Sequence, residues 1–182
     1  MATNTISRSL HDVGLAAWFG GTLANAVSLN SAAAEAGDAS STGKVANAGW
    51  DRWTPVNAAA IGAHLVGSVG QLSGNRSRLQ AQEGVASMAL TKTLLTAAAL
   101  GATAYSRVLG QKVSAYDDLP AESGTTPSSS TPSEAAKAQK RLAVLQWVVP
   151  ALTGALVVIS SYAGEQQRAT EVHKGIAGRL IG

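Results

Sequence analysis

The chain lacks cysteine, is poor in charge and has few aromatic residues. Its 182 residues include no Cys, one Phe and 14% charged residues, whereas about a quarter of the residues in a soluble domain are charged. Without cysteine, disulfide scaffolds and Cys-based zinc, iron–sulfur or redox sites are excluded. The formal charge of +3 is spread along the chain, with no block of Lys or Arg of the kind that binds nucleic acid. No nucleic-acid partner is therefore expected.

Small apolar residues fill the chain instead, in four long tracts with almost no charge. The chain has 35 Ala and 19 Gly, and the tracts cover residues 13–34, 54–75, 84–106 (interrupted only by Lys92) and 142–164. Each tract is 22 or 23 residues long, which matches the roughly 20 residues that a helix needs to cross the hydrocarbon core of a bilayer. A soluble bundle of Ala-rich helices is the alternative, but it would need a charged outer face, which these tracts lack.

We therefore predict an all-α fold: a polytopic integral membrane protein whose single domain is a four-helix transmembrane bundle. The lipid bilayer is its expected partner. Small residues let helices pack closely, which is compatible with a homo-oligomer or a larger membrane complex. The predicted spans are about 10–34, 54–75, 86–107 and 140–164, with a flexible Ser/Thr/Pro-rich loop at 115–133 and a charged tail at 165–182.

The orientation and the amino end each leave an alternative open. Lys and Arg are almost evenly divided between the two sides of the predicted bundle, so the positive-inside rule decides little. The compact loop with Arg76 and Arg78 favours the cytoplasmic side for both termini of a multi-pass cell-membrane protein. Alternatively, residues 1–36 are a cleaved signal peptide, with Arg8 before the apolar stretch and small residues near 32–36 as its cleavage site.

Uncharged polar residues recur at helical spacing in each tract, so that they form a stripe on one face. Because polar side chains are penalised in lipid, the four stripes are expected to converge in the bundle interior. There they either hold the helices together by hydrogen bonds or line a polar cleft that binds a ligand. The stripes comprise His11, Trp18, Thr22 and Asn25; Asn57, His64, Ser68, Gln71 and Asn75; Lys92, Thr96, Thr103 and Ser106; and Gln146, Thr153 and Ser160.

Two ionisable residues in these stripes are candidate binding residues. Lys92 lies less than two turns into its span. Its side chain therefore either snorkels to the membrane interface or stays buried as a functional cation. His64 lies near the centre of its span, where it must be neutral and hydrogen-bonded or act as a ligand. Together with Asn57 and Gln71, these residues form the candidate cofactor-binding set.

The first span begins with a short motif. His11, Trp18 and the pair at 20–21 form a His-x6-Trp-x-Gly-Gly pattern. This pattern resembles the first helix of the copper-resistance D-type membrane domain and related small four-helix membrane families. The resemblance implies an all-helical membrane fold and copper or haem handling, with His11 as the matching position. His11 and His64, the latter added for its depth, are then the candidate metal ligands, although a chain with three His, two Met and no Cys offers copper(I) few soft ligands.

Two functions remain open after motifs for catalysis are considered. The chain has no His-Glu-x-x-His or Gly-x-Ser-x-Gly motif and no close carboxylate pair inside a tract, so an enzyme is not expected. The predicted function is a non-enzymatic structural or accessory membrane component. The alternative is metal, haem or small polar solute binding or transport through the polar bundle interior, which predicts a cavity at the level of His64 and a second ligand on another helix.

Overall fold

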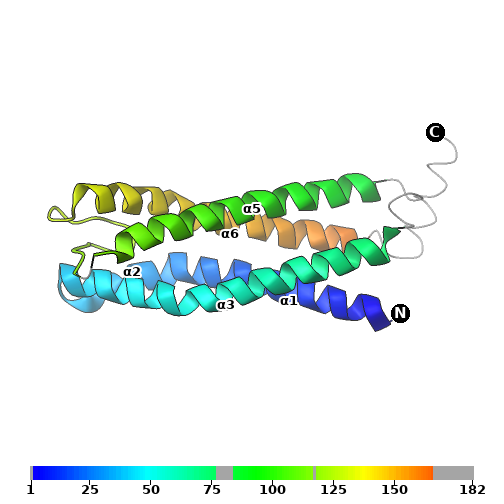
Figure 1. The fold of residues 1–182 in the computed structure, drawn as a ribbon, viewed down its shortest axis with the longest axis horizontal. Helices are drawn as coiled ribbons and strands as arrows, with labels where there is room; N and C mark the ends of the chain where they lie inside the picture. Colours follow the sequence, from blue (N-terminus) through cyan, green and yellow to red (C-terminus); the bar gives the residue numbers. More distant parts are fainter. Residues whose placement is uncertain (1, 77–83, 117, 166–182) are drawn as a thin grey trace.

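Four long antiparallel helices form an elongated bundle (Figure 1). The computed structural model describes residues 2–76, 84–116 and 118–165, and within them the prediction of an all-α fold is confirmed. The start of the first helix and the end of the last lie at the same end of the bundle (Figure 1). The helices are α1 (Ala2–Ala24), α3 (Ala39–Gly74), α5 (Val85–Ser114) and α6 (Ser133–Glu165). The predicted tail at 165–182 lies outside the described residues, except for Glu165.

The helices extend beyond the uncharged tracts, and the start of α3 is set by a cap rather than by hydropathy. After α1 the chain stays helical through a π-helical segment (Asn25–Leu29), α2 (Asn30–Ala32) and a 3₁₀ segment (Ala33–Ala36). Asp38 then caps α3, since its carboxylate accepts from the backbone N–H groups of Ser40 and Ser41 at 3.0 Å each. Helix α3 therefore begins 15 residues before the predicted span at 54–75.

Helix packing divides the bundle into two pairs. The main contacts join α1 to α3 and α5 to α6, and α1 also packs on α6, whereas α3 and α5 barely touch. Glycines bring the first pair together at backbone distance. A Cβ atom on Gly14 would lie 2.5 Å from the carbonyl oxygen of Ala60, and one on Gly67 would collide with the backbone N of His11. No side chain larger than hydrogen fits at these two positions.

The loop between α5 and α6 packs over one end of the bundle. The sequence predicts a flexible, solvated loop at 115–133, yet Leu119, Ala121 and Thr125 are buried. The backbone N–H of Ala121 donates to the carbonyl oxygen of Ala39 at 2.9 Å, and that of Gly124 to the carbonyl oxygen of Asn30 at 3.0 Å. These residues are therefore packed rather than solvated.

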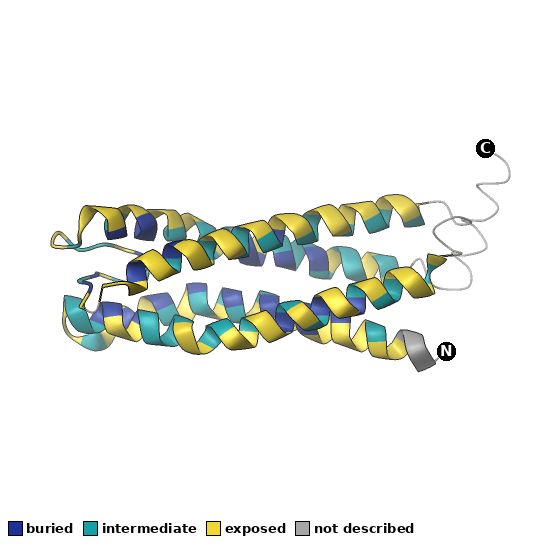
Figure 2. Ribbon diagram, viewed as in Figure 1, coloured by how far each residue is buried: buried dark blue, intermediate teal, exposed yellow. Residues whose placement is uncertain are grey.

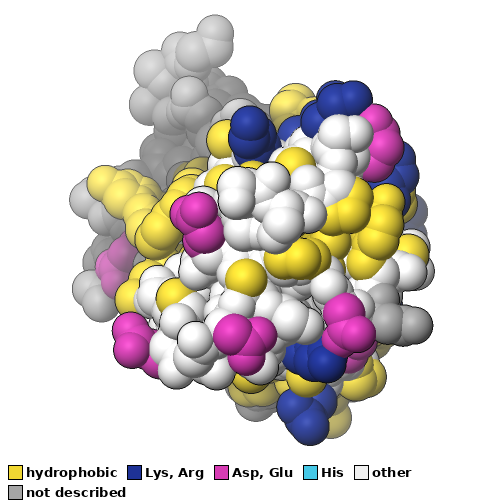
Figure 3. Space-filling model, turned by 90° about the vertical axis from the view of Figure 1, so that its left-hand side faces the viewer, with side chains coloured by type: hydrophobic (Ala, Val, Ile, Leu, Met, Phe, Trp, Pro, Cys, Tyr) yellow, Lys and Arg dark blue, Asp and Glu magenta, His cyan; other side chains and the backbone are white. Residues whose placement is uncertain are grey.

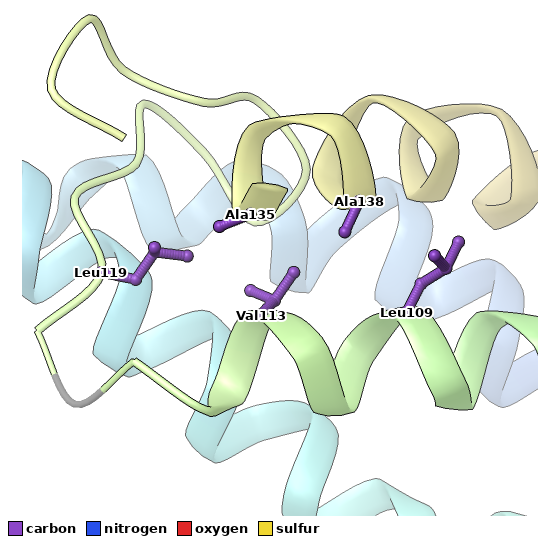
Figure 4. Close-up of a cluster of buried hydrophobic side chains, with 5 residues drawn as sticks. All are labelled: Leu109, Val113, Leu119, Ala135 and Ala138. Carbon is purple, nitrogen blue, oxygen red and sulfur yellow. The ribbon is translucent and has the colours of Figure 1, made fainter. Parts of the chain in front are cut away.

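An apolar cluster joins this loop to the adjacent helix ends (Figure 4). Figure 3 looks onto the same end, where acidic and basic side chains are mixed with uncharged ones. Lys44 of α3 pairs there with Asp118 of the loop at 2.5 Å. The cluster consists of Leu109, Val113, Leu119, Ala135 and Ala138.

The polar stripes face inward along the bundle together with apolar residues such as Trp18 and Leu156, and many other large aliphatic side chains face outward. Every residue of the four predicted polar stripes is buried or half-buried, so the stripes do converge in the interior. Exposed residues run along the outer faces of the helices (Figure 2), and many of them have large apolar side chains. Examples on all four helices are Val13, Val66, Val69, Leu90, Leu94, Val144 and Val158, each at least 60% exposed.

Two of the described helices are long and apolar enough to cross a membrane. These are α5 and α6. The helices α1 and α3 carry more polar residues, including the buried His11, Thr22 and His64.

Candidate functional site

Two buried histidines meet where α1 and α3 touch. His11 is 1% exposed and His64 is not exposed at all. Their ring centroids lie 4.5 Å apart, with the ring planes tilted by 45°. The contact depends on Gly14 and Gly67, because these glycines let the two backbones approach. A second buried histidine on another helix, His11, therefore lies against the ring of His64.

Hydrogen bonds determine which nitrogen of each imidazole carries hydrogen. His11 Nδ1 lies 2.7 Å from Asp12 Oδ1, and an ionised carboxylate only accepts, so Nδ1 donates. His64 Nδ1 lies 3.4 Å from the carbonyl oxygen of His11, which also only accepts. In a neutral ring Nε2 is then the acceptor. Thr96 Oγ1 lies 3.5 Å from His64 Nε2, whereas His11 Nε2 is buried with no hydrogen-bond partner in the described part of the chain.

The rest of the motif in the first span supports this contact. Trp18 is fully buried, and its ring centroid lies 6.0 Å from that of His64. Its indole Nε1 donates to Thr103 Oγ1 of α5 at 3.3 Å. Gly21 lies against the ring of Trp53 in α3, where a Cβ atom would collide. His11, Trp18 and Gly21 of the pattern thus lie on the face of α1 that contacts α3 and α5, whereas Gly20 is exposed.

A polar cavity of about 310 Å³ adjoins His11 near the end of the bundle where α1 begins. All four helices contribute to its wall. Arg8 and Asp12 come from α1, Gln71 from α3, Lys92 from α5 and Ser160 from α6. Gln71 Nε2 and Ser160 Oγ are buried, and neither has a hydrogen-bond partner among the described residues. The wall therefore combines two cationic groups, one carboxylate and several polar atoms that a ligand could satisfy.

The structure brings together most of the predicted site residues. His11, Gln71 and Lys92 line this polar cavity, and His64 lies directly behind the ring of His11. Asn57 does not join them, since it lines a separate cavity nearer the start of α3. The sequence analysis missed Arg8 and Asp12 as site residues. Arg8 precedes His11 by three positions, so helical spacing alone would have placed it on the same face.

The donor set for a metal ion is small. Among the residues that the structure describes, no group of three or more His, Cys, Asp or Glu side chains could hold a metal ion. One ring nitrogen of His11 is without a partner, but Arg8 and Lys92 line the same cavity, and positive charge opposes cation binding. Copper and haem therefore stay predictions from the sequence.

Comparison with known proteins adds no family to this description. No family model matches the chain, and neither curated proteins nor solved structures give a match. The resemblance of the first span to the copper-resistance D-type domain stays a prediction.

Proposed function

We propose that the protein is a polytopic membrane protein in which all four helices span the bilayer. The support is the inverted burial pattern, with His11, His64 and Thr153 inside and large aliphatic side chains outside. In water, such a surface would expose far more apolar area than a soluble protein tolerates. In lipid, the same pattern keeps polar groups in contact with one another. The less apolar α1 and α3 are then carried by their mutual contact and by α6.

The sides of the membrane can be assigned by labelling, because the chain contains no native cysteine. Ser130→Cys lies in the loop between α5 and α6, and Ser73→Cys lies at the opposite end, near the end of α3; both positions are exposed. In intact cells, a membrane-impermeant maleimide should label one position and spare the other. Labelling of Ser130→Cys alone places the termini in the cytoplasm. Equal labelling of both, or a chain that stays monodisperse in buffer without detergent, contradicts the proposal.

We propose further that the polar cavity binds a small anionic solute. The observations that carry this are the ammonium group of Lys92 in the wall and the buried polar atoms of Gln71 and Ser160, which have no partner in the described chain. Cationic groups at the edge of a low-dielectric region attract an anion strongly. The amide N–H and hydroxyl groups supply the hydrogen bonds that an oxyanion needs.

The histidine pair narrows the class of anion. With Asp12 accepting from Nδ1, the free Nε2 of His11 is an acceptor, so the best ligand also carries an O–H group that can donate to it. Hydrogen phosphate and 2-hydroxycarboxylates such as lactate meet both requirements. His64 does not line the cavity. Its role is to hold the His11 ring, since the two rings pack against each other.

Titration calorimetry on the detergent-purified chain tests this function. Lactate and phosphate should bind, and glycerol, which has hydroxyl groups but no charge, should not. Lys92→Met should weaken lactate binding about ten-fold or more, because it removes a charge-assisted contact. Lys140→Met is the matched control, since Lys140 is exposed on α6 and does not line the cavity.

The outcomes separate this function from its competitors. If neither lactate nor phosphate gives a binding signal with the wild type or with Lys92→Met, the chain is better described as a structural or accessory membrane component. If instead copper or haem copurifies and His64→Leu abolishes its retention, the metal hypothesis is favoured.

A further inference from the structure

A second cavity, of about 320 Å³, lies in the seam between α3 and α5. The two helices barely touch there, although each packs closely on another helix. The cavity extends inward as far as Val149 of α6 and Thr22 of α1. Near its edge, Arg107 of α5 reaches Asp51 of α3 across the seam, at 3.5 Å. In a four-span protein this seam faces the lipid, so it gives a lateral route from the bilayer into the bundle.

The wall of this second cavity is mostly apolar. Ile61 of α3, Leu100 of α5 and Leu145 of α6 contribute aliphatic surface, and two indole rings line the α3 side. This contrasts with the polar cavity at His11, where charged groups from two helices meet. The second cavity therefore suits the hydrocarbon part of a lipid-soluble molecule.

Two buried polar atoms in this wall have no hydrogen-bond partner among the described residues. They are Trp53 Nε1, which can only donate, and Asn57 Oδ1, which can only accept. The two residues are four positions apart on α3, so they lie one above the other on one face of the helix. The neighbouring Trp50 differs, because its Nε1 donates to Asn30 Oδ1 at 3.0 Å. A buried polar group without a partner is costly and calls for an explanation.

We propose that the α3–α5 cavity binds a neutral, single-chain lipid whose head is a hydroxyl group. A hydroxyl both accepts and donates, so it is a partner of the right kind for Trp53 Nε1 and for Asn57 Oδ1, whose residues both line the cavity. The hydrocarbon chain of the lipid lies against the aliphatic wall and leaves through the seam. A carboxylate head could accept from Trp53 but could not donate to Asn57. Long-chain alcohols and monoacylglycerols belong to the favoured class. The inference rests on the membrane location proposed above, and not on the anion site.

Photo-crosslinking in nanodiscs tests the proposal. The probe is a long-chain alcohol with a diazirine in its chain, and the crosslinked residues are identified by mass spectrometry. We expect crosslinks on the facing sides of α3 and α5. Decanol should compete at a concentration at least about five-fold lower than decane or decanoate, because only decanol supplies both hydrogen bonds. Crosslinks spread over the outer faces of α1 and α6, or equal competition by decanol and decane, overturn the proposal.

Matched variants connect this preference to the two polar atoms. Trp53→Phe keeps an aromatic ring but removes the N–H group, and Asn57→Leu removes the acceptor. Either variant should abolish the advantage of decanol over decane. Trp50→Phe, which lines the same cavity but whose N–H is already bonded, should keep it. Asn57→Leu should also have a Tm no lower than wild type without ligand, which excludes misfolding as the cause. Retention of the preference in both Trp53→Phe and Asn57→Leu contradicts the assignment.

The labelling experiment makes failure of this inference distinguishable from failure of the membrane proposal. If Ser130→Cys and Ser73→Cys report opposite sides but decanol has no advantage over decane, the chain spans the bilayer and the lipid assignment alone is wrong. If both positions label equally, the membrane location is wrong and the lipid assignment is wrong with it.

Discussion

The two helix pairs of the bundle are held together by different physical means. In the α1/α3 pair the backbones touch at Gly14 and Gly67, and the interface buries imidazole rings. In the α5/α6 pair the contact is made by aliphatic side chains such as Leu109 and Val113. Only the second pair is apolar enough to cross a membrane by composition alone. The comparison shows that close backbone contact hides the polar faces of α1 and α3 from their surroundings, which is what the proposed location in a bilayer would need.

The largest effect is expected from closing the space between α1 and α3. Gly67→Ala would place a methyl group against the backbone of His11, so the helices must separate and the histidine contact must open. We expect a loss of about 3 kcal/mol in the free energy of unfolding, the upper end of the cost of overpacking. Gly62→Ala on the same helix is the control, because nothing lies within 4 Å of a Cβ atom there. Thermal or SDS unfolding in detergent measures both, and equal stability of the two variants would show that the backbones are not in contact.

A smaller loss is expected from the apolar pair. Leu109→Ala removes a 2% exposed side chain from the cluster that joins α5, α6 and the loop. The cavity it leaves should cost about 2 kcal/mol, the lower end for Leu to Ala, because the loop can partly collapse onto it. Leu94→Ala, on the same helix but 62% exposed, should be close to neutral. If Leu94→Ala proves the more harmful change, Leu94 is covered by another chain rather than by lipid.

Some features of the helix pairs and of the site could be predicted from the sequence and others could not, because residue types differ in what they indicate about structure. The lack of charge in the tracts predicted four helices, and the polar spacing correctly predicted that His64 and Gln71 lie inside. Charged residues were read as marking the limits of the spans, so Arg8 and Asp12 were not considered for the site. Asn57 was grouped with Gln71 because they share a face, but 14 residues of helix separate them by about 21 Å, and each lines a different cavity.

Tertiary contacts explain the remaining differences. The composition of 115–133 indicated a solvated loop, because Ser, Thr and Pro dominate its centre. Leu119 and Ala121 are buried there only because Val113, Ala135 and Ala39 are brought to the same end of the bundle. A local window cannot contain that information. The unpartnered atoms of Trp53 and Asn57 are likewise visible only once the neighbouring helices are in place.

A third prediction concerns the link between the two pairs. Asn30 is 3% exposed; its Nδ2 donates to Gln146 Oε1 of α6 at 2.7 Å, and its Oδ1 accepts from Trp50 of α3. Asn30→Leu would leave both partners without these bonds, at a cost of about 1–2 kcal/mol. Asn30→Asp should recover the bond from Trp50. The free energies of unfolding of the two variants give the comparison, and a neutral Asn30→Leu would mean that the pairs are joined elsewhere.

The smallest effect is expected at the loop end, where Lys44 of α3 pairs with Asp118. The hydrogen bond and charge of Lys44 hold the pKa of Asp118 below its ordinary value of 3.8. A depressed carboxyl pKa stabilises the folded chain above the ordinary value, and that stabilisation is lost as the pH falls through the folded value. Both side chains are more than half exposed, so Asp118→Asn should lower Tm by only about 1 °C at pH 7.

The same pair can be tested by pH and salt, and the result bears on the comparison with the helix interior. The difference in Tm between wild type and Asp118→Asn should shrink towards zero as the pH falls well below 3.8, because the carboxylate is then protonated. It should also shrink at pH 7 in 1 M salt, because exposed charges are screened. The cost of Gly67→Ala should be unaffected by salt, since it arises from steric overlap between backbones. A salt-dependent cost of Gly67→Ala would mean that charge contributes to the α1–α3 contact. A Tm difference between wild type and Asp118→Asn that persists at low pH would mean that Asp118 stabilises the loop end by packing and not by charge.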